Sequence, residues 1–364
     1  MRTGFFAIIG AAAIWAAAAV SPAQAGPHIV VDLGNGKVLS QESAFQPWYP
    51  ASLTKLMTAW VAFRAIEDGQ MTLQSPVTIS ANAAKEPPSK MGYKPGSVLT
   101  LDNALKIIMV KSANDVATAI GESVAGSEEA FARRMNLESQ KLGMTGSHWV
   151  NAHGLHSDQQ YTSARDLAVL AASLRTRFPQ YAGYFKIEAI GAGKTIIPNH
   201  NTLIARFAGA DGMKTGYTCP AGFNMVASAS RDGRTLIAVV IGESSAETRA
   251  EKAAELLVRG FRTGGFAAPR LAGLRPSGGI SAQPVNMRSS ICTAEAREAR
   301  WANRGEGGKV VIRSPHIFEL DRPRRVVAVG LGGVTGPVAP MPEYANVPIP
   351  TPRPDHRPAL AQGG

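Results

Sequence analysis

Three apolar runs of β-forming residues, close together in the second half of the chain, constrain its fold more than any other feature. The runs cover residues 212–218, 223–230 and 235–242. Short connections separate them, and the second connection contains Asp232-Gly233, a strong hairpin signal. Residues 246–261 follow with apolar side chains at helical spacing. The pattern therefore predicts three antiparallel strands and an amphipathic helix that covers the sheet.

The first half of the chain adds one hairpin and many helical residues. Apolar runs at 28–32 and 37–40 flank a Gly-Asn-Gly turn, which is typical of a hairpin. A helix is expected to open near Ser52, and residues 80–175 have a mainly helical pattern. These segments together predict an α+β fold, in which an antiparallel sheet is flanked by helices and adjoins a helical lobe.

Composition divides the 364 residues into three parts. Residues 1–25 combine a basic start, an apolar run and the small-residue site Ala23-Gln24-Ala25, which is typical of a secretion signal. That apolar run is shorter than the roughly 20 residues needed to span a bilayer, and we expect no transmembrane segment once it is cleaved. Residues 26–265 are expected to form the folded domain. Residues 266–364, rich in proline and arginine, are expected to form a largely irregular extension.

Charge and cysteine content narrow the classes of partner. The net charge of +11 is consistent with an anionic partner, such as a cell-wall polymer or a membrane surface, and equally with simple solubility. The chain lacks the interleaved aromatic and basic residues of single-strand binders, so no nucleic acid is expected. Export implies an oxidising compartment, but the sequence leaves open whether Cys219 and Cys292 pair or stay free.

Three short strings carry the residues that can do chemistry. They are Ser52-Leu53-Thr54-Lys55, Ser112-Ala113-Asn114 and Lys214-Thr215-Gly216. Ser52 and Lys55 stand at i and i+3, so they share one face of a helix. A serine hydroxyl needs a base, and a lysine serves as that base only when burial and a second cation keep it neutral. Lys214 can be that second cation, and Gly216 would let a substrate backbone approach its strand closely.

Each string alone has an ordinary structural explanation. A serine near a helix start is usually a cap, and a lysine on a helix is usually solvated. Ser80-Ala81-Asn82 repeats the middle string, but it precedes a Pro-rich loop and is better explained as a cap. Ser112 follows an apolar-faced helix, which can direct it into a cleft. All three strings occur together in this order, and that combination favours a catalytic site.

With its flanking residues, the chain resembles the serine-type D-alanyl-D-alanine carboxypeptidases, which are low-molecular-mass penicillin-binding proteins. The resemblance rests on residues 49–55 and 211–218 and covers about residues 27–263. It implies that Ser52 attacks the penultimate D-Ala carbonyl of a peptidoglycan stem peptide ending in D-Ala-D-Ala. Lys55 takes the proton, the terminal D-Ala leaves, and water hydrolyses the acyl-enzyme. β-Lactams would acylate the same serine.

The resemblance also assigns the remaining site residues. Ser112 relays a proton to the leaving amine, and Asn114 holds Lys55 and the substrate amide. Lys214 and Thr215 hold the terminal carboxylate, with Arg249 as a further candidate. The backbone N–H groups of Ser52 and Tyr217 form the oxyanion hole. The family often has an arginine between two asparagines where this chain has His200, a residue with only partial charge at neutral pH.

Other functions make different demands on the chain. A class A β-lactamase needs a loop glutamate to activate the deacylating water, and the comparable stretch 147–151 has no carboxylate. D,D-endopeptidase action on cross-links and non-catalytic wall binding stay open as alternatives. His153 and His156 lack an adjacent third ligand, so no metal or other cofactor is expected. The protein is expected to be exported, and periplasmic or associated with the cell wall.

Overall fold

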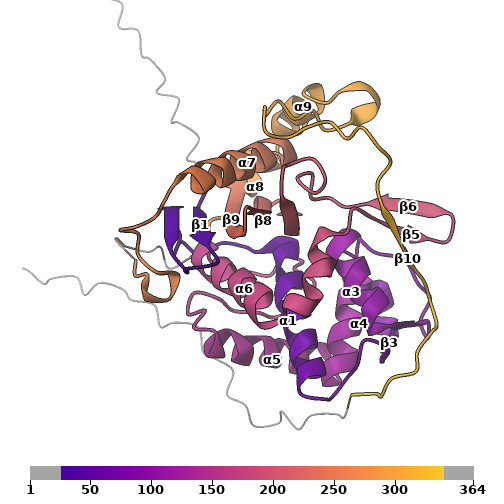
Figure 1. Ribbon diagram of the computed structural model, residues 1–364. Helices are drawn as coiled ribbons and strands as arrows, with labels where there is room; N and C mark the ends of the chain where they lie inside the picture. Colours follow the sequence, from indigo (N-terminus) through magenta and orange to yellow (C-terminus); the bar gives the residue numbers. More distant parts are fainter. Residues whose placement is uncertain (1–25, 277, 280, 282, 340–364) are drawn as a thin grey trace, which may run out of the picture.

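The structure, a computed structural model, describes residues 26–276, 278–279, 281 and 283–339 (Figure 1). The predicted secretion signal, residues 1–25, and the Pro-rich end, residues 340–364, lie outside the described residues. Within the part that is described, no helix is both long enough and apolar enough to cross a membrane.

A five-stranded antiparallel sheet forms the centre of the fold, in the order β2-β1-β9-β8-β7. Its strands are β1 (His28–Asp32), β2 (Val38–Glu42), β7 (Ala210–Thr218), β8 (Gly222–Arg231) and β9 (Arg234–Glu243). The predicted hairpin and the three predicted strands therefore form as expected, with ends that differ from the predicted ones by up to two residues. The β1–β2 hairpin pairs with β9, and β7 lies at the other edge of the sheet.

Both faces of the sheet are buried, and alternate residues of β9 show how. Leu236, Ala238 and Val240 pack with Ala250, Ala253 and Leu257 of α7 (Ala246–Arg262). Ile237, Val239 and Ile241 belong to the larger core beneath α1 (Thr54–Glu67) and α6 (Ala164–Arg177). This alternation follows from the two-residue period of a strand. Figure 1 shows α7 on one side of the sheet and α1 and α6 on the other.

The helical lobe stands beside the sheet, as predicted. It consists of α2 (Ala81–Lys85), α3 (Leu101–Val110), α4 (Asn114–Ala125) and α5 (Glu128–Lys141), with a short hairpin of β3 (Pro76–Thr78) and β4 (Val98–Thr100). Helix α1 contacts α4 and α5 of the lobe as well as α6, which packs on the sheet. Side chains of Ser80, Thr100 and Ser127 accept hydrogen bonds at the N-termini of α2, α3 and α5. Each such cap stabilises its helix by about 1 kcal/mol.

The described part of the extension is mostly irregular, but it packs on the domain. Its elements are η3 (Leu271–Gly273), α8 (Arg288–Ile291), α9 (Ala294–Ala302), η4 (Glu306–Gly308) and β10 (Val326–Val329). β10 runs parallel to β5 (Ala189–Ala192), which pairs with β6 (Thr195–Pro198). Arg322 and Glu188 form a bidentate ion pair with N–O distances of 2.8 and 2.9 Å. Figure 1 shows this stretch running along the molecule from α9 past β5 towards the helical lobe.

Cys219 and Cys292 form a disulfide, which answers the question that the sequence leaves open. Cys219 follows β7 directly, and Cys292 follows α8. The covalent bond therefore ties the extension to the end of the edge strand.

Candidate active site

The three strings of the sequence meet where α1, the helical lobe and β7 come together. A single 3₁₀ turn, η1 (Ala51–Leu53), carries Ser52 directly before α1, and Lys55 lies in the first turn of that helix. Ser112 follows α3, and Asn114 begins α4. Ser52 makes no capping hydrogen bond, because Pro50 occupies the N-cap position of η1. Capping therefore does not account for this serine, whereas Ser80 of the repeated string is a helix cap, as predicted.

Lys55 is fully buried and has three polar partners at its amine. Its Nζ lies 2.8 Å from Asn114 Oδ1, 2.5 Å from the His153 carbonyl oxygen and 3.2 Å from Ser52 Oγ. Burial lowers the pKa of Lys55 well below its usual value, and the charge of Lys214 lowers it further, while Glu86 and Asp115 raise it. The burial and the second cation that the sequence argument requires are therefore both present.

The partners of Lys55 also define the direction of proton transfer. Asn114 Nδ2 donates to the Pro87 carbonyl at 2.9 Å, so its Oδ1 faces the amine. Oδ1 and the His153 carbonyl only accept, and together they use both N–H bonds of a neutral amine. The nitrogen lone pair is then left for the third partner. A neutral Lys55 can therefore accept the hydroxyl proton of Ser52.

Ser112 and Lys214 form the second contact between distant strings. Lys214 Nζ lies 3.0 Å from Ser112 Oγ and donates to its neighbouring carbonyl, that of Thr215, at 2.9 Å. Burial and the nearby charge of Arg249 lower the pKa of Lys214 to about 7. Ser112 has a φ of 61°, a left-handed conformation that is uncommon for serine and often found at functional sites.

Gly216 allows the edge strand to approach the serine closely. A Cβ atom at this position would lie 3.1 Å from the Ser52 backbone nitrogen and 3.0 Å from the Pro50 carbonyl oxygen. Asn224 of β8 supports the same region, because its Nδ2 donates to the Tyr49 carbonyl at 3.0 Å. Tyr217 follows Gly216 on β7, and its side chain is 42% exposed. The backbone of β7 therefore lies against the turn that carries Ser52.

Arg249 lies buried near this strand, with few partners for its charge. Its Nη1 is 3.4 Å from the Asn224 carbonyl, and its Nε has no hydrogen-bond partner among the described residues. Burial lowers the pKa of Arg249 to about 10. His200 is partly open to solvent, but the protein that surrounds it and the charges of Lys214, Lys111 and Arg249 lower its pKa to about 4, so it adds no charge at neutral pH. A buried guanidinium without a carboxylate partner favours an anionic ligand.

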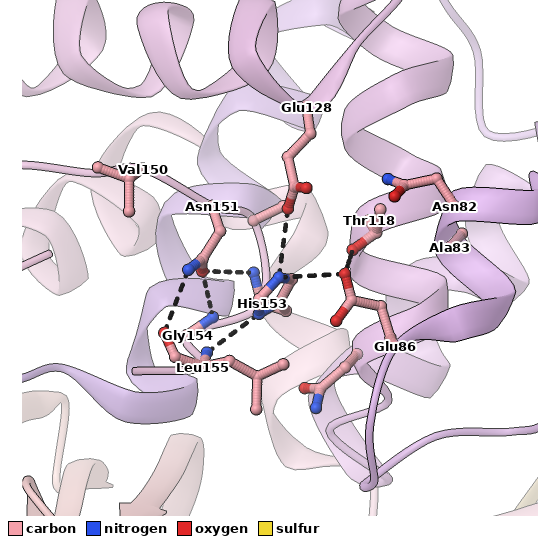
Figure 2. Close-up of polar contacts among 12 residues, drawn as sticks. Asn82, Ala83, Glu86, Thr118, Glu128, Val150, Asn151, His153, Gly154 and Leu155 are labelled. Carbon is pink, nitrogen blue, oxygen red and sulfur yellow. Dashed lines mark hydrogen bonds and ion pairs between the residues drawn. The ribbon is translucent and has the colours of Figure 1, made fainter. Parts of the chain in front are cut away.

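Figure 2 shows a cluster that sequence spacing misses, in which Glu86 and Glu128 approach His153. His153 Nε2 lies 3.3 Å from Glu86 Oε1 and 3.2 Å from Glu128 Oε1. Among residues 26–276, 278–279, 281 and 283–339, these three form the group whose ligand atoms are close enough for a metal ion. Neither carboxylate lies near His153 in the sequence, so only the fold brings them to it.

The hydrogen bonds of His153 do not suit a metal ligand. The Leu155 backbone N–H donates to His153 Nδ1 at 3.0 Å (Figure 2). Burial lowers the pKa of His153, but hydrogen bonds to Glu128 and Glu86 outweigh burial, so the pKa lies above its usual value. To accept the Leu155 N–H, Nδ1 must carry a lone pair and no hydrogen. A neutral ring then carries its hydrogen on Nε2, the atom that would bind the ion. Metal-bound histidines normally donate from their other nitrogen.

Backbone carbonyls are the functional groups that sequence reasoning misses. The His153 carbonyl holds Lys55, and the Pro87 carbonyl holds Asn114. The two loops that supply these carbonyls can be recognised from their Pro and Gly content, but no side-chain pattern marks the role of a carbonyl. Gly154 gives one signal: its φ is 90°, and a Cβ there would lie 1.9 Å from the Ala51 carbonyl oxygen.

A serine beside a buried lysine, between an antiparallel sheet and a helical lobe, defines the class of serine acyl-transfer folds in which lysine takes the place of a catalytic histidine. The family model described as D-alanyl-D-alanine carboxypeptidase matches residues 15–245. The chain belongs to this family.

Individual relatives and solved structures agree with the family. The D-alanyl-D-alanine carboxypeptidase DacC of Escherichia coli (strain K12) is 36% identical over 241 residues, which cover 64% of this chain and 60% of the relative. Penicillin binding protein 5 from Haemophilus influenzae has a TM-score of 0.63 and 32% identity, over 67% of this chain and 73% of that one. Penicillin-Binding Protein D2 from Listeria monocytogenes, in its ampicillin-bound form, has a TM-score of 0.58 and 26% identity, over 65% and 97% of the two chains. The chain thus spans about 60% of the length of the first curated relatives it matches.

Proposed function

We propose that the protein is a serine D-alanyl-D-alanine carboxypeptidase, which removes the terminal D-Ala from peptidoglycan stem peptides through an acyl-enzyme. The contact between Lys55 Nζ and Ser52 Oγ carries the proposal, because two acceptor-only partners leave the lysine lone pair to the serine hydroxyl. Family membership and the printed names of the relatives support the same activity.

In the acylation step, Ser52 Oγ attacks the carbonyl carbon of the penultimate D-Ala, and the hydroxyl proton moves to Lys55 Nζ. The negative charge that forms on the carbonyl oxygen is held by the backbone N–H groups of Ser52 and Tyr217. When the C–N bond breaks, Ser112 relays the proton to the leaving amine of the terminal D-Ala. Its hydrogen bond to Lys214 orients the hydroxyl for this transfer.

The terminal carboxylate of the substrate would be held by Lys214, Thr215 and Arg249. Lys214 and Arg249 are buried cations, and no carboxylate lies within ion-pair distance of either among the described residues. A bound carboxylate would raise the pKa of Lys214 and keep it charged. Because His200 is neutral at pH 7, these two cations provide the charge for binding.

Water completes the cycle by hydrolysing the acyl-enzyme, and a β-lactam would acylate Ser52 in place of the peptide. Slow release of the penicilloyl group distinguishes this proposal from a class A β-lactamase. Residues 147–151 carry no carboxylate, and Glu86 is engaged with His153 and with the Thr118 hydroxyl at 3.0 Å. We therefore expect a long-lived adduct in place of rapid penicillin hydrolysis.

A peptidoglycan substrate also predicts where the protein acts, and the composition of the chain suggests how it is divided. Peptidoglycan lies outside the cytoplasm, so we propose an exported protein that is periplasmic or associated with the cell wall, with residues 1–25 as its signal. Residues 26–265 would form the catalytic domain. Residues 266–364 would form an extension that packs on the domain over part of its length.

Labelling with a fluorescent penicillin tests the proposal directly. Wild-type protein should retain one covalent label at Ser52 and should release D-Ala from a pentapeptide ending in D-Ala-D-Ala, as detected by mass spectrometry. Ser52→Ala should lose both activities. Ser80→Ala, which alters the repeated string at a helix cap, is the matched control and should keep both. Absence of label on the wild-type protein would overturn the proposal.

A further inference from the structure

A segment of the extension lies against the end of β7, and we call residues 285–304 the tethered segment. The Met287 backbone N–H donates to the Pro220 carbonyl at 2.9 Å, and Ile291 is only 2% exposed. The Cys219–Cys292 disulfide fixes the segment covalently to the residue that follows β7. It lies beyond residues 15–245, which the family model matches.

The tethered segment brings a basic helix face to Phe223 of β8, the register partner of Tyr217. Arg297 and Arg300 are three residues apart, so they share one face of α9. Arg300 Cζ lies 5.7 Å from the centroid of the Phe223 ring. Phe223 stacks on Tyr217 with centroids 4.2 Å apart, and these two residues are partners in the β7–β8 register. Arg300 and Tyr217 therefore both lie against the Phe223 ring.

Tyr217 also touches the disulfide itself. Its hydroxyl oxygen lies 3.2 Å from Cys292 Sγ and 3.8 Å from Cys219 Sγ. The disulfide, the Tyr217–Phe223 pair and Arg300 thus form one continuous surface at this end of β7. Stacking on an aromatic ring leaves the in-plane N–H groups of an arginine available for a carboxylate.

The proposed function sets the direction in which a bound peptide runs along β7. Lys214 and Thr215 hold the terminal carboxylate, and the Tyr217 N–H holds the carbonyl one residue earlier in the peptide. The C-terminus of the bound peptide would therefore lie near Lys214, and its earlier residues would lie towards Thr218. Because β7 is an edge strand, the peptide can extend antiparallel beside it. The residues that precede D-Ala-D-Ala, spaced at about 3.3 Å each, then reach the tethered segment.

We propose that the tethered segment forms the subsite for the peptide residues that precede D-Ala-D-Ala, and that Arg300 selects an acidic side chain there. This inference rests on the proposed function and names the substrate class of the same site. The two glutamates of α9, Glu295 and Glu298, stand three residues apart on another face of the helix, so the face with Arg300 stays basic. The disulfide holds this face in place, and its loss would free the segment from β7.

Two matched peptides test the proposal, identical except for Glu or Gln directly before D-Ala-D-Ala. We expect wild-type protein to release D-Ala from the Glu peptide with a kcat/KM roughly fivefold higher, the effect of one partly exposed charge pair. Arg300→Gln and Cys292→Ser should bring the ratio close to one, and Arg300→Lys should keep part of it. Penicillin labelling of each variant shows whether the Ser52 site is folded.

Arg259→Gln is the matched control, because Arg259 is an exposed arginine of α7 that pairs with Glu255. Its Glu-to-Gln ratio should equal that of the wild type. An equal rate for both peptides with the wild type, or an unchanged ratio in Arg300→Gln, would overturn this inference and leave the proposed function standing. If the wild type neither binds penicillin covalently nor releases D-Ala, the proposed function fails, and this inference fails with it.

Discussion

The amine of Lys214 lies 3.0 Å from the hydroxyl of Ser112, although 102 positions separate the two residues along the chain. One residue comes from the edge strand of the sheet, and the other follows a helix of the lobe. Their contact closes the site between the two parts of the fold, beside the Ser52–Lys55 pair.

Replacing Lys55 by methionine should reduce acylation by a β-lactam by about 10²–10⁴-fold, the usual contribution of general base catalysis. Methionine fills the buried space without a base, so the effect should come from chemistry more than from unfolding. Stopped-flow measurement of acylation checks this. Lys141→Met, which removes an exposed lysine from α5, is the control and should acylate at the wild-type rate. A Lys55→Met rate within threefold of the wild type would contradict the role of the lysine.

The pH profile of the acylation rate should shift at its acid side when Glu86 is neutralised. Lys55 acts as a base only when unprotonated, so the rate should fall as pH drops through its pKa. The charge of Glu86 raises that pKa, and Glu86→Gln should therefore shift this side of the profile to lower pH. Glu128→Gln is a close control, because Glu128 also touches His153 but is not among the groups that shift Lys55. Equal shifts in both variants would refute this electrostatic explanation.

Lys214 should make the stability of the protein depend on pH. Its pKa is about 7 when folded and 10.5 when unperturbed, so between these values the unfolded chain binds more protons. The free energy of unfolding should therefore rise with pH from about 7 towards 10. Below about pH 7 the destabilisation by this lysine is fully present. Urea unfolding of the wild type and of Lys214→Met at several pH values measures the effect, and a parallel dependence in both proteins would disprove it.

Gly216→Ala should slow acylation with little loss of stability. The added Cβ would lie 3.1 Å from the Ser52 nitrogen and 3.0 Å from the Pro50 carbonyl, which would push the strand from the serine turn. A displacement of this kind can cost about 10²-fold in rate. Gly183→Ala is the control, because its Cβ would have no neighbour within 4 Å. Acylation kinetics and thermal melting should be measured together, and a normal acylation rate would show that the close approach is not needed.

Chelation of metal ions should leave acylation unchanged. The Leu155 N–H keeps the hydrogen of a neutral His153 on Nε2, which blocks the atom that faces Glu86 and Glu128. Acylation rates before and after treatment with EDTA, and with added Zn²⁺, check this expectation. A loss of activity with EDTA that Zn²⁺ restores would show that the cluster binds a metal after all.

Local patterns were sufficient to predict the strands and helices that carry the site. The runs at 212–218, 223–230 and 235–242 could be assigned because strand periodicity and turn residues are local properties. The choice of Ser112 over Ser80 also rested on local context, and Ser80 caps α2. Resemblance to a family then linked the three strings to one reaction.

Contacts between distant segments could not be predicted in this way. The pairing of Cys219 with Cys292 depends on where an irregular extension packs, and its sequence has little periodicity. Glu86 and Glu128 approach His153 from separate segments of the chain, so no spacing in the sequence predicts this cluster. The lowered pKa of His200 follows from loss of surrounding water and from cations on other elements.

The sequence by itself determined which side chains are available for chemistry and which local elements carry them, because both follow from residue type and short-range periodicity. Only the tertiary structure decided that Lys55 is buried between two carbonyl-type acceptors, that Lys214 reaches Ser112, and that the extension is tied to β7. Burial and long-range hydrogen bonds set the pKa of a lysine, and both depend on segments far apart in the chain.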